Sequence, residues 1–451
     1  MKKLNQASRD GFGSSLGMLL ALVGSAVGLG NIWRFPYLVG ENGGAAFILI
    51  YLFFALVFSL PLILCEFVIG RRGQANAAAC FTRLAPGSKW GLAGLLTVLS
   101  SFVILSFYSV IGGWGVEYFF KSVSLDFTAE AGMDYSAMFS DFVSGVWPPI
   151  IFALIFFVAT AAVVSTGVKN GIEKCSKVMM PVLFFLMLFL AVRSMLLPGA
   201  AAGIDYVFKP DFSLVTADTV VAAMGQAFFS LSIGIGILTT FASYSPKTDN
   251  MVRSSALTVG LDTLFALIAS CAIMPAVFAF GFSPSQGPGL VFIMLPKMFG
   301  EMQGGGIVAI VFFFAFFIAA ATSAISLLEV VVAYVSEKFS ISRRKAVFSV
   351  SAVLVPIMVA VSLSQGALSG FTVSGMNLLD LFDYVTSTFM ITAGGFLIVI
   401  FTGWKLGKAA FVDEMSNGGT IKLPRRLIGT IFFLIKYIIP VGILAIVVSS
   451  L

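Results

Sequence analysis

Two short glycine-rich runs stand out because each interrupts a long apolar segment. Residues 28–30 read Gly-Leu-Gly in the first such segment, and residues 234–236 read Gly-Ile-Gly in the sixth. Glycine costs about 1 kcal/mol more than alanine in a helix, so paired glycines favour unwinding. An unwound turn exposes carbonyl oxygens that suit a hard cation. The amides that begin the next half-helix suit a carboxylate.

Close packing between helices through small residues is the alternative explanation for such glycines. The two runs, however, lie at corresponding positions, five apolar segments apart. Matching interruptions in two halves of a chain are typical of transporters built from inverted repeats, in which the broken helices form the binding site. We therefore expect a binding site where the two runs meet.

Composition indicates that the elements positioning these runs lie in a membrane. The chain has 451 residues, of which 59% are hydrophobic and 11% charged, whereas about a quarter of the residues of a soluble domain are charged. There is no histidine, so chemistry that relies on imidazole is excluded. The cysteines are scattered, without a C-x-x-C pair, and are expected to be packing or loop residues: Cys65, Cys80, Cys175 and Cys271.

Hydropathy predicts eleven membrane-spanning helices, since the apolar runs are too long for barrel strands. They are expected near residues 11–37, 45–70, 91–120, 149–167, 173–195, 218–242, 253–281, 306–336, 346–364, 379–403 and 427–449. With this count, 21 of the 27 lysines and arginines fall on one side of the membrane and four on the other. This bias predicts a cytoplasmic N-terminus and a C-terminus on the outside. The formal charge of +6 is therefore attributed to orientation and not to nucleic-acid binding.

Several longer motifs resemble the neurotransmitter:sodium symporter family, over nearly the whole chain. They are Asn-Ile-Trp-Arg-Phe-Pro-Tyr at 31–37, Glu-Asn-Gly-Gly at 41–44, Pro-Leu-Ile-Leu-Cys-Glu at 61–66, Gly-Gln-Ala-Phe-Phe-Ser-Leu-Ser at 225–232, Thr-Ser-Ala-Ile-Ser at 322–326 and Asp-Tyr at 383–384. Eleven spans are typical of the bacterial branch, which transports leucine, tyrosine and other hydrophobic amino acids. The resemblance implies a single all-α domain over residues 1–451. Its inverted repeats would cover about 11–195 and 218–403, with helices one and six unwound and an extra helix at 427–449.

The resemblance also implies two sodium ions held by oxygen ligands. One site would use the following residues: Gly24, Val27, Ala319, Thr322 and Ser323. The other would use Ala26, Asn31, Ser230 and Asp262, completed by the carboxylate of the substrate. Asp262 stands where relatives usually have asparagine, although the alignment allows a slip of one turn. An acidic residue here implies transport without chloride. The alternative is that Asp262 lies near the cytoplasmic end of its helix and meets water.

The substrate pocket follows from the same resemblance. The residues implied to line it are Ala26, Gly28, Leu29, Gly30, Ile104, Tyr108, Phe229, Ser230, Ser232, Ile235, Ser323 and Leu327. Carriers of monoamines place aspartate at the position of Gly28, so glycine implies a substrate with its own carboxylate. The mostly apolar lining favours tryptophan, tyrosine, phenylalanine, leucine or methionine, and an aromatic side chain above the others.

Gates are implied on both sides of the pocket. Arg34 would pair with Asp383 on the outside, unless Arg34 only extends to the membrane surface. Arg9 would pair with Glu337 near Tyr244 on the inside.

The sequence thus predicts a sodium-coupled symporter of hydrophobic amino acids in a bacterial inner membrane, a monomer or weak homodimer that binds no nucleic acid. An ion channel or a sensor that binds without net flux remains an alternative. No residue pattern indicates an enzyme.

Overall fold

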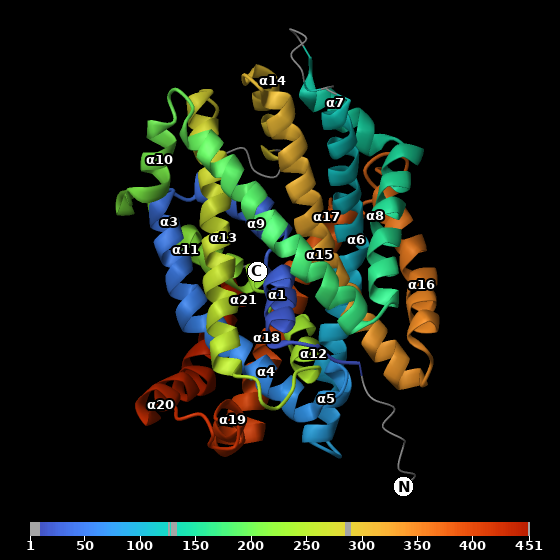
Figure 1. Cartoon of the computed structure of the whole chain (residues 1–451), viewed down its shortest axis with the longest axis vertical. Helices are drawn as coiled ribbons and strands as arrows, with labels where there is room; N and C mark the ends of the chain where they lie inside the picture. The colour runs from blue at the N-terminus through green and yellow to red at the C-terminus, as the bar shows by residue number, and fades with distance from the viewer. Residues whose placement is uncertain (1–9, 125–126, 128–132, 285–289, 450–451) are drawn as a thin grey trace.

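The computed structural model is helical and describes residues 10–124, 127, 133–284 and 290–449. Over these residues the only β-structure is an isolated bridge between Val373 and Met376. The all-α prediction is therefore confirmed. Most of the long helices run roughly side by side, as Figure 1 shows.

The helices and their bounds, in chain order, are α1 (Ser15–Ala26), α2 (Phe35–Glu41), α3 (Ala45–Phe54), α4 (Leu60–Gly73), α5 (Ala77–Leu84), α6 (Gly91–Val123), α7 (Tyr135–Ser144), α8 (Trp147–Ser165), α9 (Lys174–Met195), α10 (Ala201–Phe208), α11 (Ala217–Ser230), α12 (Ile237–Ser243), α13 (Met251–Ala279), α14 (Met294–Glu301), α15 (Gly305–Phe339), α16 (Arg343–Leu363), α17 (Leu378–Tyr384), α18 (Ile391–Ile400), α19 (Gly407–Met415), α20 (Arg425–Phe433) and α21 (Ile439–Ser449). Wider π-helical turns occupy Gly30–Arg34, Ala55–Ser59, Val168–Glu173, Val385–Met390, Phe401–Leu406 and Leu434–Ile438.

Nine of the helices in the described ranges are long and apolar enough to cross a membrane. A tenth span forms if α1 and the helix Gly30–Glu41, which are bent by 49° at their junction, are taken together. The predicted count of eleven also includes the segment at 218–242. In the structure this segment consists of α11 and α12, which are interrupted between Ser230 and Ile237.

Both predicted interruptions occur, and local backbone conformation explains the second. Gly234 and Gly236 have φ values of +81° and +77°, and Ser232 has a φ of +54°. These left-handed conformations end one helix and prevent the next from continuing it. A Cβ atom on Gly234 would also overlap the carbonyl oxygen of Ile391. The α11–α12 break is therefore built into the sequence.

The tenth predicted segment differs from the structure at its end. The sequence predicts that it stops near residue 403, before a basic loop, but the helix runs on through Phe401–Leu406 into α19 and ends at Met415. Phe411 and Met415 are buried, so α19 has an apolar face that packs against the bundle. Figure 1 shows α19 and α20 at the same end of the bundle as α5, with α7, α10 and α14 at the opposite end.

The first helix lies inside the bundle. It contacts α9, α13 and α15, and α15 in turn packs along α6, α8 and α9. Ser14 caps the start of α1, accepting a hydrogen bond from the amide of Gly17. This packing holds the α1 break close to α11 and α15.

Two stretches, 198–217 and 282–305, are predicted from the sequence to lie on the outside and, from their Gly, Pro and Ser content, to fold as partial lids. The structure places α10 and α14 in them. The Tyr206 hydroxyl of α10 donates a hydrogen bond to the Gly40 carbonyl at 2.8 Å, which fixes this helix over the end of α2.

Candidate functional site

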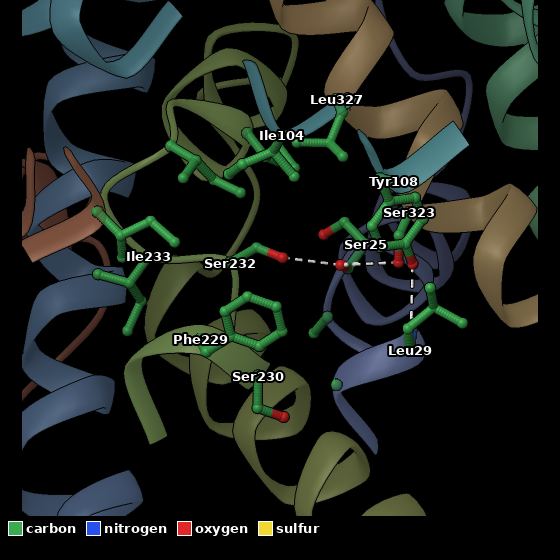
Figure 2. Close-up of a pocket in the computed structure, with 16 residues that line it drawn as sticks. Ser25, Leu29, Ile104, Tyr108, Phe229, Ser230, Ser232, Ile233, Ser323 and Leu327 are labelled. Atoms are coloured by element: carbon green, nitrogen blue, oxygen red, sulfur yellow. Dashed lines mark hydrogen bonds between the residues drawn. The ribbon is translucent and has the colours of Figure 1, made fainter. Parts of the chain in front are cut away.

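A cavity lies where the α1–α2 interruption faces the α11–α12 interruption (Figure 2). All twelve residues predicted for the substrate pocket line it, together with Ser25, Ile233, Ile237 and Ile391. Its free volume is about 40 Å³, enough for about three water molecules. An amino acid could therefore enter only if the walls move apart.

One side of the cavity is polar. The Leu29 amide donates to the Tyr108 hydroxyl at 3.3 Å, a contact drawn in Figure 2. A Cβ atom on Gly28 would overlap the Ser323 hydroxyl and lie 3.0 Å from that of Tyr108. Gly28 therefore keeps open a small space bordered by an amide and two hydroxyls, groups that can hold a carboxylate.

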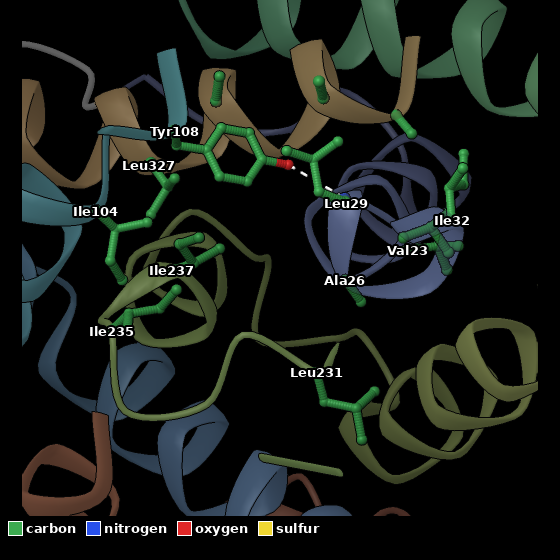
Figure 3. Packing of buried hydrophobic residues seen from close by; sticks show 14 of the residues in the cluster. Val23, Ala26, Leu29, Ile32, Ile104, Tyr108, Leu231, Ile235, Ile237 and Leu327 are labelled. Atoms are coloured by element: carbon green, nitrogen blue, oxygen red, sulfur yellow. Dashed lines mark hydrogen bonds between the residues drawn. The ribbon is translucent and has the colours of Figure 1, made fainter. Parts of the chain in front are cut away.

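The other side is apolar. Figure 3 shows Ile104 of α6, Leu327 of α15, Ile237 of α12 and Ile235 of the break before α12 grouped beside Tyr108. These side chains are at most 6% exposed, and none of the aliphatic ones offers a hydrogen bond. The cavity therefore combines a polar end with a wall suited to a hydrophobic side chain.

Three of the four residues predicted for the sodium site at Asp262 meet at its buried carboxylate. Asp262 of α13 accepts hydrogen bonds from Asn31 Nδ2 at 2.8 Å, Ser230 Oγ at 2.9 Å and Tyr51 Oη at 3.1 Å. All four residues are buried. Asp262 thus lies in the middle of the bundle, beside both helix breaks, and not in water at a helix end. The carboxylate and its neighbouring oxygens could hold a hard cation.

A second group of oxygens lies between α1 and α15. Ser323 Oγ donates to the carbonyls of Gly24, at 3.4 Å, and Ser25, at 3.3 Å. Thr322 Oγ1 donates to the Ala319 carbonyl at 3.0 Å, and a Cβ atom on Gly24 would be 3.3 Å from that of Thr322. These neutral oxygens suit a monovalent cation. Over the residues with described positions, no group of three or more His, Cys, Asp or Glu side chains could hold a metal ion.

Side chains from neighbouring helices hold the break between α11 and α12. Glu66 of α4 accepts hydrogen bonds from the amide of Gly234 at 2.8 Å and from the hydroxyl of Thr239 at 2.9 Å. Ser101 of α6 donates to the Ile235 carbonyl at 2.5 Å. The two breaks are joined directly by the hydrogen bond from Ser232 Oγ to the Ser25 carbonyl at 2.8 Å. The freed backbone groups thus have partners within the protein.

The model of the sodium:neurotransmitter symporter family matches residues 9–136 and 145–451. The chain belongs to this family. A sodium-dependent transporter of Bacillus subtilis named YhdH is 37% identical over 431 residues, which cover 96% of this chain and 95% of the relative. A sodium-dependent transporter of Haemophilus influenzae is 34% identical over 460 residues, with 99% of each chain covered. Both relatives are described as uncharacterized.

A solved structure is also similar. The crystal structure of MhsT in complex with L-phenylalanine is 40% identical and has a TM-score of 0.90, covering 98% of this chain and all of the other. The family and the long apolar helices together make the chain a multi-pass membrane protein of a sodium-dependent transporter family.

On one side of the symporter's pocket lies a larger cavity of about 280 Å³. Leu29, Tyr108 and Phe229 line both cavities and therefore separate them. Arg34 and Asp383, the predicted outer gate, both line the larger cavity, but they form no ion pair within 4.0 Å in the structure as described. The Arg34 guanidinium carbon instead lies 4.6 Å from the centre of the Phe229 ring. The arginine thus contacts the aromatic cover of the pocket.

At the opposite gate, the predicted pairing of Arg9 with Glu337 stays a prediction. Arg9 lies outside the described residues. Glu337 accepts hydrogen bonds from the amide and the side chain of Asn76, both at 2.8 Å, at the start of α5. Tyr244 donates to Glu329 at 2.7 Å. Arg343 of α16 forms an ion pair with the same Glu329 carboxylate. Glu329 lies two turns before Glu337 on α15, so both face this end of the bundle.

Several functional candidates are absent from the sequence-based set, namely Tyr51, Glu66, Glu329 and Arg343. Glu66 and Glu329 carry a signal that could have found them, because a carboxylate within an apolar span needs a partner. Tyr51 and Arg343 carry none, because their importance lies in contacts with distant segments of the chain.

Proposed function

We propose that this protein couples the sodium gradient to the uptake of a hydrophobic, preferably aromatic, L-amino acid by alternating access. The observation that carries the proposal is the cavity between the two helix breaks. The Leu29 amide, the Tyr108 hydroxyl and the space above Gly28 suit a carboxylate, and the Ile104, Ile235 and Leu327 side suits an apolar side chain. The phenylalanine complex of MhsT, a protein of similar fold, supports the same substrate class.

Two sodium ions are proposed. The first would bind beside Asn31, Ser230 and Asp262, with the Ala26 carbonyl and the substrate carboxylate completing its ligands. The second would bind between Gly24 and Val27 of the first span and Ala319, Thr322 and Ser323 of α15. Because substrate and ion would share the carboxylate, neither would bind strongly without the other.

Chloride independence follows from Asp262. The carboxylate places a negative charge beside the proposed first ion, where a chloride ion would otherwise balance it. Its three hydrogen-bond donors hold the charged form in place within the apolar bundle.

For orientation we propose a cytoplasmic end that holds α5, α19 and α20, since the basic residues gather there. We also propose that residues of about 11–195 and 218–403 form the two inverted repeats.

A binding screen tests the proposal. Purified protein is mixed with each of the proteinogenic amino acids and with indole-like compounds, in sodium or potassium and with chloride or gluconate. We expect saturable binding of aromatic amino acids in sodium, equal in chloride and gluconate. Equal binding in potassium would contradict sodium coupling, and a requirement for chloride would contradict the role of Asp262.

A further inference from the structure

Between the last two long helices the chain forms an elbow, residues 405–426, which contains α19 and the start of α20. Figure 1 shows α19 and α20 together at the end of the bundle that also holds α5. The elbow contains the end of one candidate membrane-spanning helix, Leu378–Met415, and the start of the next, Arg425–Ala445. It therefore lies at the level where a membrane meets water.

Both acidic side chains of the elbow pair with arginines of α4: Glu414 is buried, and Asp413 is exposed. Glu414 accepts a hydrogen bond at 2.5 Å from Arg71 of α4, which is fully buried. Asp413 pairs with Arg72 at 2.8 Å. The elbow is thus attached to α4 by two ion pairs, and its own negative charges are not available to balance nearby cations.

The basic side chains of the elbow face outward. Five of them are exposed, and none forms an ion pair with another described residue: Lys405, Lys408, Lys422, Arg425 and Arg426. Large apolar side chains lie beside them, with Trp404 59%, Leu427 49% and Phe433 53% exposed. Five uncompensated cations next to exposed aromatic and aliphatic groups match an anionic membrane surface, whose headgroups lie above an apolar layer.

We propose that the outer face of this elbow binds anionic phospholipid headgroups in the adjoining leaflet. The cations contact lipid phosphates, while Trp404 and Leu427 enter the apolar boundary below them. An acidic protein partner would match the charge, but it would leave these side chains exposed to water.

The lipid-bound elbow is connected to the first helix of the transport pathway. Asn417 Nδ2 donates to the Asp249 carbonyl at 3.1 Å, and Arg71 donates to the same carbonyl at 2.6 Å. The Asp249 side chain in turn accepts a hydrogen bond from Ser15 Oγ, at the start of α1, at 2.6 Å. Lipid that holds the elbow in place thereby holds this end of α1 against the bundle.

Lipid binding by the full-length protein tests the proposed phospholipid site on the elbow. The variant replaces all five elbow cations by glutamine. The control replaces five exposed cations elsewhere on the same end, with the same loss of charge: Lys89, Lys174, Lys247, Arg344 and Lys345. Native mass spectrometry then counts the phosphatidylglycerol retained from mixed micelles with phosphatidylcholine. We expect about tenfold weaker phosphatidylglycerol binding for the elbow variant and little change for the control. Equal losses in both variants, or equal retention of phosphatidylcholine, would overturn the site.

Hydrogen exchange tests the connection to α1. In nanodiscs containing phosphatidylglycerol, amides of residues 15–23 should exchange several-fold more slowly than in phosphatidylcholine alone. Glu414→Gln should abolish this difference. Because this change leaves Arg71 buried without its charged partner, Asn417→Gly is the second variant. Asn417 has a φ of +48°, so glycine fits the backbone and removes only the side-chain hydrogen bonds to the Thr248 and Asp249 carbonyls. Because Arg71 still reaches the Asp249 carbonyl in Asn417→Gly, we expect a smaller lipid effect in that variant. Unchanged lipid protection in both variants, with phosphatidylglycerol still bound, would overturn the connection.

Discussion

Gly28 illustrates how a single missing side chain can define a site. Its Cβ atom would overlap Ser323 Oγ, so Gly28→Ala should fill the polar end of the pocket. We expect amino-acid affinity to fall about tenfold or more, which corresponds to the 1–3 kcal/mol typical of overpacking. Isothermal titration calorimetry with phenylalanine in sodium buffer measures this affinity.

Gly260→Ala is the matched control for this substitution. Gly260 lies within α13, and no atom lies within 4 Å of the Cβ that alanine would add. Binding should be unchanged and the protein slightly more stable, by up to about 1 kcal/mol. Similar binding losses in both variants would show that the effect of Gly28 is not local.

Asp262→Asn tests the proposed replacement of chloride. Asparagine has nearly the same shape and can still accept hydrogen bonds from Ser230 and Tyr51, but it removes the negative charge. We expect uptake to fall about tenfold or more in gluconate, and to recover in part when chloride is added. Asp205→Asn, an exposed carboxylate in α10, should have no effect in either buffer. A loss that chloride does not restore would argue against charge balance as the role of Asp262.

At the residue scale, the sequence predicted best where a residue type is unusual for its surroundings. Glycines and an aspartate within apolar segments are visible without a structure, and the structure places Gly28 and Asp262 at the cavity and beside it. The partners of these residues are less visible. Tyr51 lies 211 positions from Asp262, and a tyrosine in an apolar helix has no distinctive signal of its own.

At the scale of the element, contacts between the end of α12, α15 and α16 hold together the end of the bundle that also contains α5. Glu329 is completely buried and is paired with Arg343 and Tyr244. Removing the charge of Arg343 leaves this carboxylate without a charged partner, at a cost of about 3–5 kcal/mol. Arg343→Gln should therefore favour the conformation in which this end opens and water reaches Glu329. Faster hydrogen exchange in residues 237–243 is the expected signature.

The neighbouring arginine supplies the control. Arg344 is exposed and forms no ion pair within the described part of the chain, so Arg344→Gln changes the charge of the same helix end without affecting Glu329. Its exchange pattern should match that of the unmodified protein. If Arg343→Gln also matched it, the Glu329 cluster would not be what keeps this end closed.

Most helices could be predicted because their apolar runs are long and glycine marks their interruptions. The extension of the tenth helix into α19 could not, because its charged residues are typical of a loop. They are accommodated there because Arg71 and Arg72 of α4 neutralise Glu414 and Asp413. That Tyr244 contacts Glu329 could not be predicted either, since Glu329 and Glu337 lie on one helix and only packing distinguishes them. The pairing of Arg9 with Glu337 stays a prediction.

For the whole molecule, the arrangement explains how ion and substrate could be coupled. Hydrogen bonds join the two breaks to each other, to the Asp262 cluster and to the α1–α15 oxygens. The pocket is separated from the 280 Å³ cavity only by Leu29, Tyr108 and Phe229. A channel would require a continuous path, whereas these three residues close the pocket on the side of the larger cavity.

Gradient-driven uptake in proteoliposomes tests the central claim most directly. Vesicles loaded with potassium gluconate are diluted into sodium gluconate that contains labelled phenylalanine. We predict transient accumulation of phenylalanine above its outside concentration, which disappears when sodium is equal on both sides. Accumulation without a sodium gradient, or phenylalanine binding without any uptake, would contradict sodium-coupled symport.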